Sequence, residues 1–315
     1  MADPVTVGID ASKGHLDVAA RPGGRFRVAN DPGGLAELVA RLRRLTPSLV
    51  VLEATGGYEA DALAALLAAG IPAAVVNPRQ VRQFAAGVGQ HAKTDPIDAA
   101  VLAHFAAVVA PPPAAPADPE RVVLAALLDR RRQLLGMRVA EGNRLRPGLP
   151  GPVRAGIGSH VAWLDDQVAE LDRAVAAAVR RSPAWRERDR LLRSIPGVGP
   201  VVSRTLLADL PELGSHPPGR LAALAGVAPF AADSGRRRGE RHIRGGRREV
   251  RRALDMAALA VARVPGPLRD FARRLKARGK PSKVVLIAVA RRLLVIANAV
   301  VRDGREWDAK RATAA

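Results

Sequence analysis

The stretch from residue 5 to residue 29 reads VTVGIDASKGHLDVAARPGGRFRVA and holds three short β-rich runs in succession. Each run is rich in β-branched and apolar residues and stops at a turn that contains Gly, which is typical of consecutive strands. Further helices and strands alternate after it. The expected ranges are 5–10, 15–20 and 25–29 for three strands, 34–45 for a helix, 49–54 for a strand, 59–69 for a helix, 73–77 for a strand, and from about Pro96 for a last helix.

Three strands followed by alternating helix and strand is the order of a ribonuclease-H fold. A doubly wound nucleotide-binding fold begins instead with strand, helix and strand, and has a Gly-rich turn after the first strand. No G-x-G-x-x-G follows Asp10 in this chain. We therefore predict an α/β N-terminal domain of the ribonuclease-H-like class over residues 1–109.

A proline-rich segment separates this domain from the rest of the chain. The stretch APPPAAPADPE (110–120) is a stiff linker, because proline removes backbone donors and disfavours helix at the residue before it. Two long helical patterns follow, at 120–145 and 159–181, and a Pro/Gly-rich bend separates them. Their Val and Leu spacing predicts an antiparallel coiled-coil hairpin, which with the linker covers residues 110–189. Residues 190–315 are expected to form a mostly α-helical domain of short helices.

The composition limits the kinds of site that the chain can build. It has 315 residues, 48% of them hydrophobic, and no cysteine. Any metal must therefore be held by carboxylates, histidine or water, and a reducing cytoplasm is the expected compartment. No basic region precedes an apolar stretch at the N-terminus, and no uncharged apolar run reaches about 18 residues. We expect neither a secretory signal nor a membrane span.

The positive charge is confined to one part of the chain. Residues 1–118 carry 10 Lys and Arg against 11 Asp and Glu, whereas residues 119–315 carry 40 against 19. Codon bias would spread arginine evenly, while a phosphate-binding surface concentrates it, so the pattern favours a polyanion partner. The alternative is a solvated basic surface without a partner.

Four acids are candidates for a metal site. Asp10 ends the first expected strand and Glu53 ends the fourth, which lies beside the first in the ribonuclease-H order. Asp95 and Asp98 open a helix three residues apart, so both lie on one of its faces. Carboxylates gathered in this way repel unless cations neutralise them, and two Mg²⁺ (or Mn²⁺) ions about 4 Å apart would do so and would activate a nucleophile at a phosphodiester. The alternative for a single acid at a helix start is a helix cap.

A glycine-rich turn in the basic part is a second candidate site. The stretch SIPGVGP (194–200) precedes a helix, and its glycines, Gly197 and Gly199, free backbone N–H groups that could hold a phosphate, as in helix-hairpin-helix modules. An ordinary turn between two helices explains the same residues.

A serine lies beside a cluster of arginines further along the chain. Ser234 stands between Asp233 and Gly235, and nine Arg and two Glu follow within residues 236–252. Guanidinium groups stabilise a phosphoryl transition state and favour ionisation of a hydroxyl, although Ser-Gly more often marks a turn. His242 is equally ambiguous between a phosphate contact and a base. The arginines that we predict to contact nucleic acid are Arg236, Arg237, Arg238, Arg241, Arg247 and Arg248.

These segments together resemble the DEDD-type insertion-sequence transposases (the insertion-sequence one-hundred-and-ten family) over nearly the whole chain. The matching stretches occur in the family's order, which makes them more specific together than any one alone. They are GIDASK (8–13), LEATGGYE (52–59), VNPRQVRQFA (76–85), AKTDPIDA (92–99), NRL (143–145), SIPGVGP (194–200), LAALAGVAP (221–229), DSG (233–235), RRAL (251–254) and GKPSKVVLIAVARRLLVIANAVVRDG (279–304).

The resemblance implies a RuvC-like domain, a coiled-coil linker and a transposase domain. It places the family's metal-binding acids on Asp10, Glu53, Asp95 and Asp98 and its catalytic serine on Ser234. It also implies a homo-oligomer, a dimer or tetramer, in which acids and serine come from different subunits. A structured noncoding guide RNA would direct it to donor and target DNA. The chain departs from the family in its Gly/Pro-rich hairpin bend and at Asp255, where an aromatic residue is expected.

Two other functions fit the same residues. A structure-specific endonuclease similar to Holliday-junction resolvases would hydrolyse DNA with the acids alone. A non-catalytic nucleic-acid-binding relic of an inactivated element would keep the fold, but the presence of all four acids argues against it.

Overall fold

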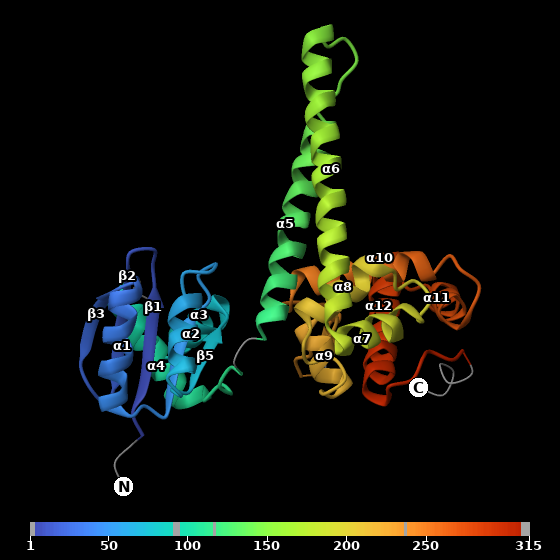
Figure 1. Cartoon of the computed structure of the whole chain (residues 1–315). Helices are drawn as coiled ribbons and strands as arrows, with labels where there is room; N and C mark the ends of the chain where they lie inside the picture. The colour runs from blue at the N-terminus through green and yellow to red at the C-terminus, as the bar shows by residue number, and fades with distance from the viewer. Residues whose placement is uncertain (1–3, 91–94, 116–117, 236–237, 310–315) are drawn as a thin grey trace. The chain divides into compact units, whose positions relative to one another are not determined.

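The computed structural model describes residues 4–90, 95–115, 118–235 and 238–309. The chain forms two compact units, Met1–Ala117 and Asp118–Ala315, and each is described by itself (Figure 1). The helical hairpin belongs to the second unit. Its separation from the C-terminal helices as a domain of its own stays a prediction.

The first unit is built on a mixed five-stranded sheet with the order β3-β2-β1-β4-β5. β2 pairs antiparallel with both β1 and β3, while β4 is parallel to both β1 and β5. This arrangement confirms the predicted ribonuclease-H-like order. The strands are β1 (Thr6–Ala11), β2 (His15–Arg21), β3 (Arg25–Ala29), β4 (Leu49–Glu53) and β5 (Ala73–Val76).

Helices cover both faces of this sheet and divide its core in two. The apolar side chains of α1 and α2 pack on one face, and those of α3 and α4 pack on the other. Prolines and capping residues set the starts of two of these helices: Asp31 accepts a hydrogen bond from the Gly34 N–H (2.8 Å), and Asn77 accepts one from the Arg79 N–H (2.9 Å). The helices are α1 (Pro32–Leu45), α2 (Ala60–Ala68), α3 (Pro78–Gly87) and α4 (Asp95–Val109).

The second unit begins with the predicted antiparallel hairpin of α5 (Pro119–Gly142) and α6 (Gly151–Arg181). Two ion pairs show its register. Arg131 contacts Asp172 at 2.7 and 3.0 Å, and Arg138, seven residues later, contacts Asp165, seven residues earlier. The second helix starts eight residues before the predicted position 159. Gly156 and Gly158 lie within this helix, and a Cβ at either position would meet open space.

The remaining helices surround a single apolar core. Most are short, as predicted, but α12 has 22 residues. It is long and apolar enough to cross a membrane by composition. However, Val289, Leu293, Leu294 and Ala297 are buried in the core, so α12 is the central helix of this unit. The elements are α7 (Pro183–Arg193), α8 (Pro200–Asp209), α9 (Pro218–Leu224), β6 (Pro229–Phe230), β7 (His242–Ile243), α10 (Arg248–Val261), α11 (Pro267–Ala277) and α12 (Ser282–Asp303).

Candidate active site and nucleic-acid interface

Two of the predicted acids lie side by side on one face of the sheet. Side chains alternate between the faces of a strand. In β1, Val7, Ile9 and Ala11 join the core beneath α1 and α2, so Asp10 faces α3 and α4. Val51 of β4 joins the core on the side of α3 and α4, and Glu53, two residues later, faces the same way. The register pairs Ile9 with Leu52, which puts the next residues, Asp10 and Glu53, in one row.

α4 lies close against β1 because position 8 has no side chain. A Cβ on Gly8 would lie 2.2 Å from the Ala99 carbonyl oxygen, and the Thr6 hydroxyl donates a hydrogen bond to the Ala103 carbonyl at 2.9 Å. As β1 runs from residue 6 to residue 8, its contacts move back along α4 from residue 103 toward residue 99. The same direction leads from Asp10 to the first turn of α4, which carries Asp98.

Asp95 is the first residue of α4, but its side chain lies outside the described part of the structure. Asp10, Glu53 and Asp98 are each partly exposed. Among the residues whose side chains are described, no three metal-ligating groups come together as a metal site. The four-acid metal site therefore stays a prediction. The fold places Asp10 and Glu53 in one row and Asp98 on the helix that covers this row.

The row of charged residues continues across the sheet beyond the predicted acids. Asp17 of β2 is the register partner of Asp10, and Arg27 of β3 is the register partner of Asp17. Directly opposed residues on neighbouring strands have their Cβ atoms about 5 Å apart on one face. The sheet therefore presents Arg27, Asp17, Asp10 and Glu53 in succession beneath α3 and α4. Neither Asp17 nor Arg27 was predicted as a site residue from the sequence.

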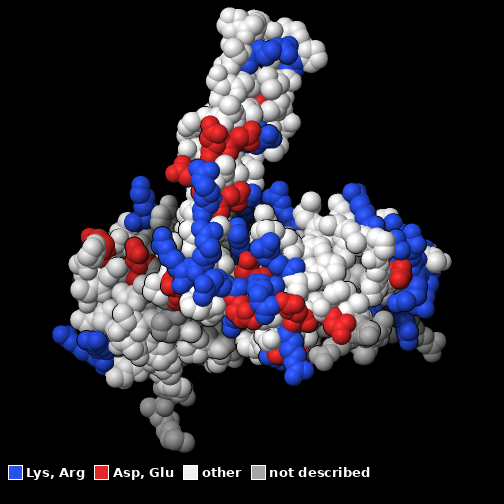
Figure 2. All heavy atoms as spheres, turned by 45° about the vertical axis from the view of Figure 1, so that its right-hand side comes forward, with Lys and Arg blue, Asp and Glu red and all other residues white. Residues whose placement is uncertain are grey.

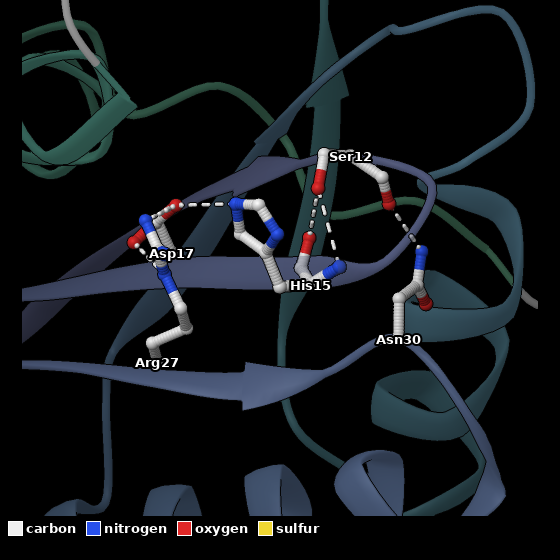
Figure 3. A network of polar contacts seen from close by, with 5 residues as sticks. All are labelled: Ser12, His15, Asp17, Arg27 and Asn30. Carbon is white, nitrogen blue, oxygen red and sulfur yellow. Dashed lines mark hydrogen bonds and ion pairs between the residues drawn. The ribbon is translucent and has the colours of Figure 1, made fainter.

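Asp17 is a buried carboxylate with a defined cation. Only 7% of the residue is exposed, and its two oxygens accept hydrogen bonds from Nε and Nη2 of Arg27 at 2.9 and 3.0 Å (Figure 3). His15 Nε2 lies 3.3 Å from Asp17 Oδ2. Both carboxylate oxygens of Asp17 are therefore bound by the Arg27 guanidinium. The positive charge of Arg27 balances the negative charge of Asp17, which would otherwise add to that of Asp10.

Asn30 ties together the two loops that follow Asp10 and Glu53. Its side-chain amide donates a hydrogen bond to the Ser12 carbonyl (2.8 Å), which Figure 3 shows, and another to the Tyr58 carbonyl (3.0 Å). The second loop is also held by Glu59, whose Oε2 accepts from the backbone and hydroxyl of Thr55 and from Gly57 N–H. Burial raises the pKa of Glu59, but these hydrogen bonds outweigh it and the net pKa is lowered. Both loops are thus organised before any ligand arrives.

The donor set on this face fits a hard divalent cation. The predicted ligands Asp10, Glu53 and Asp98 offer carboxylate oxygens only, and the imidazole of His15 on the same face lies against Asp17. Mg²⁺ and Mn²⁺ prefer such oxygen ligands, and Mg²⁺ keeps several waters, which partly exposed acids allow.

Ser234 lies in an exposed loop between β6 and β7, which pair antiparallel. The loop is closed by Asp233, which accepts hydrogen bonds from both terminal nitrogens of Arg241 (2.7 and 2.9 Å) and from the Gly239 N–H (3.1 Å). The hydrogen bonds from Arg241 are the main cause that lowers the pKa of Asp233. A Cβ on Gly239 would lie 2.1 Å from the Ala232 carbonyl oxygen, so the two sides of the loop approach closely there.

The glycine turn before α8 shows two different roles for its glycines. Gly197 has φ +82°, and a Cβ there would lie 3.0 Å from both the Ala257 carbonyl and the Val261 Cβ of α10. This glycine allows helix packing. Gly199 is exposed and precedes Pro200 at the N-terminus of α8, so a phosphate contact there stays a prediction.

The predicted nucleic-acid-binding arginines separate into three groups. Arg241 and Arg247 form bidentate ion pairs within the chain, with Asp233 and Glu212 respectively. Arg238 and Arg248 are exposed. Arg236 and Arg237 lie outside the described residues. A phosphate contact for Arg241 or Arg247 would have to compete with a carboxylate, which the sequence analysis did not anticipate.

We expect the Arg247–Glu212 pair to stabilise the second unit in a pH-dependent way. Burial raises the pKa of Glu212, but hydrogen bonds from Arg247 outweigh it and the net pKa is lowered. A lowered pKa in the folded state contributes stability above the ordinary value near 4.3, and this is lost as pH falls through the folded-state pKa. Because the pair is partly screened by solvent, Arg247→Gln should lower the free energy of unfolding by about 1 kcal/mol at pH 7.

The measurement is urea unfolding at pH 7 and pH 3 beside Arg248→Gln, which removes an exposed neighbouring charge. The difference between wild type and Arg247→Gln should shrink at pH 3. An equal difference in unfolding free energy at both pH values would show that the ionised Glu212 carboxylate does not account for the effect of Arg247→Gln.

The distribution of charge matches a polyanion partner for the second unit. Figure 2 shows Lys and Arg side chains gathered over the helical unit on the face drawn, with Asp and Glu among them near the base of the hairpin. Several acids of this unit form ion pairs with arginines, as Asp172 does with Arg131 at 2.7 Å. Residues 119–315 hold 40 basic residues against 19 acidic ones, so a positive excess remains even if each acid neutralises one basic residue.

Known proteins match nearly all of the chain. Residues 7–151 match a family described as transposase, and residues 189–273 match the transposase IS116/IS110/IS902 family. A pilin gene-inverting protein of Moraxella bovis is 29% identical over 96% of this chain and 97% of its own. A pilin gene-inverting protein of Moraxella lacunata is 30% identical over 82% and 81%. An uncharacterized 44.8 kDa protein of insertion element IS116 from Streptomyces clavuligerus is 27% identical over 96% of both chains.

These matches span the sheet that carries the acids and the helical unit that carries Ser234. They confirm the resemblance drawn from the sequence motifs. The chain therefore belongs to the IS116/IS110/IS902 family of transposases, which are DNA phosphoryl-transfer enzymes.

Proposed function

We propose that this transposase cuts and rejoins DNA strands with a metal-bound carboxylate site and a serine nucleophile. The observation that carries the proposal is the row of Asp10 and Glu53 beneath the helix that bears Asp98, in a chain of a DNA-transposing family. The first unit is RuvC-like in this proposal.

Asp10, Glu53, Asp95 and Asp98 hold two Mg²⁺ or Mn²⁺ ions, which when bound polarise the scissile phosphate and stabilise its developing charge. Asp10 and Glu53 are placed by the ends of adjacent strands, so their spacing follows from the sheet. Asp17 orients Arg27 at the far end of the same row and keeps its own oxygens engaged. The Asn30 hydrogen bonds hold both loops around the acids.

Ser234 supplies the nucleophile. Its Oγ attacks the scissile phosphorus, the Oγ–P bond forms, and the P–O bond to one neighbouring nucleoside breaks. The hydroxyl proton is lost from Ser234, and the departing oxygen leaves as a free DNA hydroxyl after it takes a proton. Religation reverses these changes on another strand. The closed loop around Asp233 and Arg241 holds Ser234 in place, and the exposed Arg238 lies within the same loop to stabilise phosphate charge.

The partners are donor and target DNA, a structured noncoding RNA and further copies of the chain. The basic second unit supports two nucleic acids, and the family resemblance supports guidance by RNA. The α5–α6 hairpin supports a coiled coil in a dimer or tetramer, because Met137, Val139 and Trp163 are each half exposed on it. We infer that the protein acts in the cytoplasm.

The test is strand exchange in vitro between a supercoiled donor plasmid with the element ends and a target plasmid. Purified protein, Mg²⁺ and RNA transcribed from the DNA beside the gene are supplied. Recombinant junctions that require metal and RNA support the proposal. Metal-dependent cleavage without junctions or a protein–DNA adduct would assign the chain to the endonuclease class, and no metal-dependent activity would mark it as a relic.

A further inference from the structure

We propose that a cleft between α6, α7 and α8 binds the backbone phosphates of duplex DNA. The cleft is lined by the last turns of α6, by α7 and by Arg204 of α8. The proposal rests on the family's action on DNA but not on the metal site or on Ser234.

Arginines from three helices line this cleft, which has a volume of about 710 Å³. Two acids, Glu187 and Asp189, lie among them, so positive charge predominates. A concave surface with one sign of charge raises the local potential more than a flat surface does. The arginines are Arg180 of α6, Arg186, Arg190 and Arg193 of α7, and Arg204 of α8.

Not all five arginines are available to a ligand. Arg190 is held by both oxygens of Glu187, at 2.7 and 2.9 Å, and by Glu306. Arg193 lies 3.7 Å from Asp189, beyond hydrogen-bond distance. The partner arginines of both acids therefore lie on α7 itself.

The other three arginines have no such partner. No hydrogen bond or ion pair joins Arg180, Arg186 or Arg204 to the described residues, and Arg180 and Arg186 are exposed. Arg204 is half buried, and its Nε is withdrawn from solvent without an acceptor. Because a buried donor without an acceptor is costly, an anion in the cleft that accepts a hydrogen bond from Arg204 Nε would be stabilised there.

A buried hydrogen bond joins two of the helices that form the cleft. Asp189 is 8% exposed and accepts a hydrogen bond of 2.6 Å from the hydroxyl of Ser203, which is fully buried. This bond joins α7 to α8 at Asp189, one of the residues that line the cleft. A surface held in this way loses little conformational entropy when it binds.

The lining chemistry points to phosphate and not to bases. Arginine forks match phosphate oxygens, whereas recognition of unpaired bases uses aromatic side chains for stacking. The residues that line the cleft include no aromatic side chain. Arginines presented by three helices can contact several phosphates of a duplex at once, and such contacts position the protein without reading sequence.

The experiment compares two charge-matched pairs of substitutions in the full chain. Arg180→Ala/Arg186→Ala removes two exposed cleft arginines, and Arg181→Ala/Arg188→Ala removes two exposed arginines of the same helices that do not line the cleft. Affinity for a 30-base-pair duplex DNA is measured against salt concentration in EDTA, so that neither metal nor cleavage contributes. An RNA hairpin of the same charge is the second probe.

We expect the cleft pair to lower the log–log salt slope for duplex DNA by about 1.8, which is about 0.9 for each lost phosphate contact. The control pair should keep the wild-type slope, and thermal unfolding should be the same for both. Equal changes in the two pairs, or a change with the RNA hairpin alone, would overturn the proposal. Neither of these results would contradict the proposed cleavage chemistry, because the binding assay in EDTA does not measure cleavage.

Discussion

We expect Asp10→Asn or Glu53→Gln to reduce Mg²⁺-dependent DNA cleavage by about three orders of magnitude, equivalent to about 4 kcal/mol of transition-state stabilisation. Each substitution keeps the size of the side chain and removes one charge from the row beneath α4. DNA affinity should stay close to that of the wild type, because the basic excess lies in residues 119–315. The measurement is single-turnover cleavage together with filter binding in EDTA.

Binding of Mn²⁺, followed by electron paramagnetic resonance, gives a second readout that does not depend on turnover. It should weaken in both variants. The matched control is Asp61→Asn, an exposed acid in the first turn of α2 on the opposite face of the sheet, which should cleave as the wild type does. Wild-type cleavage and Mn²⁺ affinity in the Asp10 and Glu53 variants would remove this row from the mechanism.

The second large effect is expected at Ser234. Ser234→Ala should abolish strand exchange, a loss of about 10⁴-fold or more for a nucleophile, and should also abolish the covalent protein–DNA adduct. The adduct is trapped by rapid denaturation and detected on a gel with labelled DNA. Ser215→Ala is the control, because Ser215 is also an exposed serine of the second unit and its hydroxyl donates to the Glu212 carbonyl.

The two variants together distinguish the chemical classes. If Ser234→Ala still cleaves DNA fully in Mg²⁺ while Glu53→Gln does not, the acids act as a hydrolytic site and the serine is part of a turn. If both variants lose cleavage, the serine and the acids serve one reaction.

The five strands of the first unit and their order in the sheet could be predicted from the sequence, because each strand has a local pattern, whereas the short strands β6 and β7 were not predicted. Alternation of apolar residues predicts each strand, and an acid at the end of two strands predicts that Asp10 and Glu53 meet. α3 was missed although Asn77 and Pro78 are a helix-start signal, because its ten residues show no long apolar repeat. The start of α6 was placed too late because glycine lowers helix propensity without forbidding helix.

The supporting contacts could not be predicted because they depend on register and on pairs distant in sequence. Asp17 becomes a neighbour of Asp10 only once the pairing of β1 and β2 is known, and Arg27 only once β3 is placed. Arg247 finds Glu212 across 35 positions of sequence. A count of arginines therefore overestimates how many are available to nucleic acid, because the sequence around an arginine does not reveal a distant acid that pairs with it.

The close approach of α4 to Gly8 has a consequence for how copies of such an element decay in a genome. A side chain at position 8 would collide with the backbone of α4 at Ala99 and Ala103, and backbone cannot rotate out of the way as a side chain can. A copy with alanine at this position would keep all four acids and an intact reading frame, yet its helix would be displaced from the sheet. Glycine at position 8 is thus a criterion for an intact copy that an inventory of acidic residues alone would overlook.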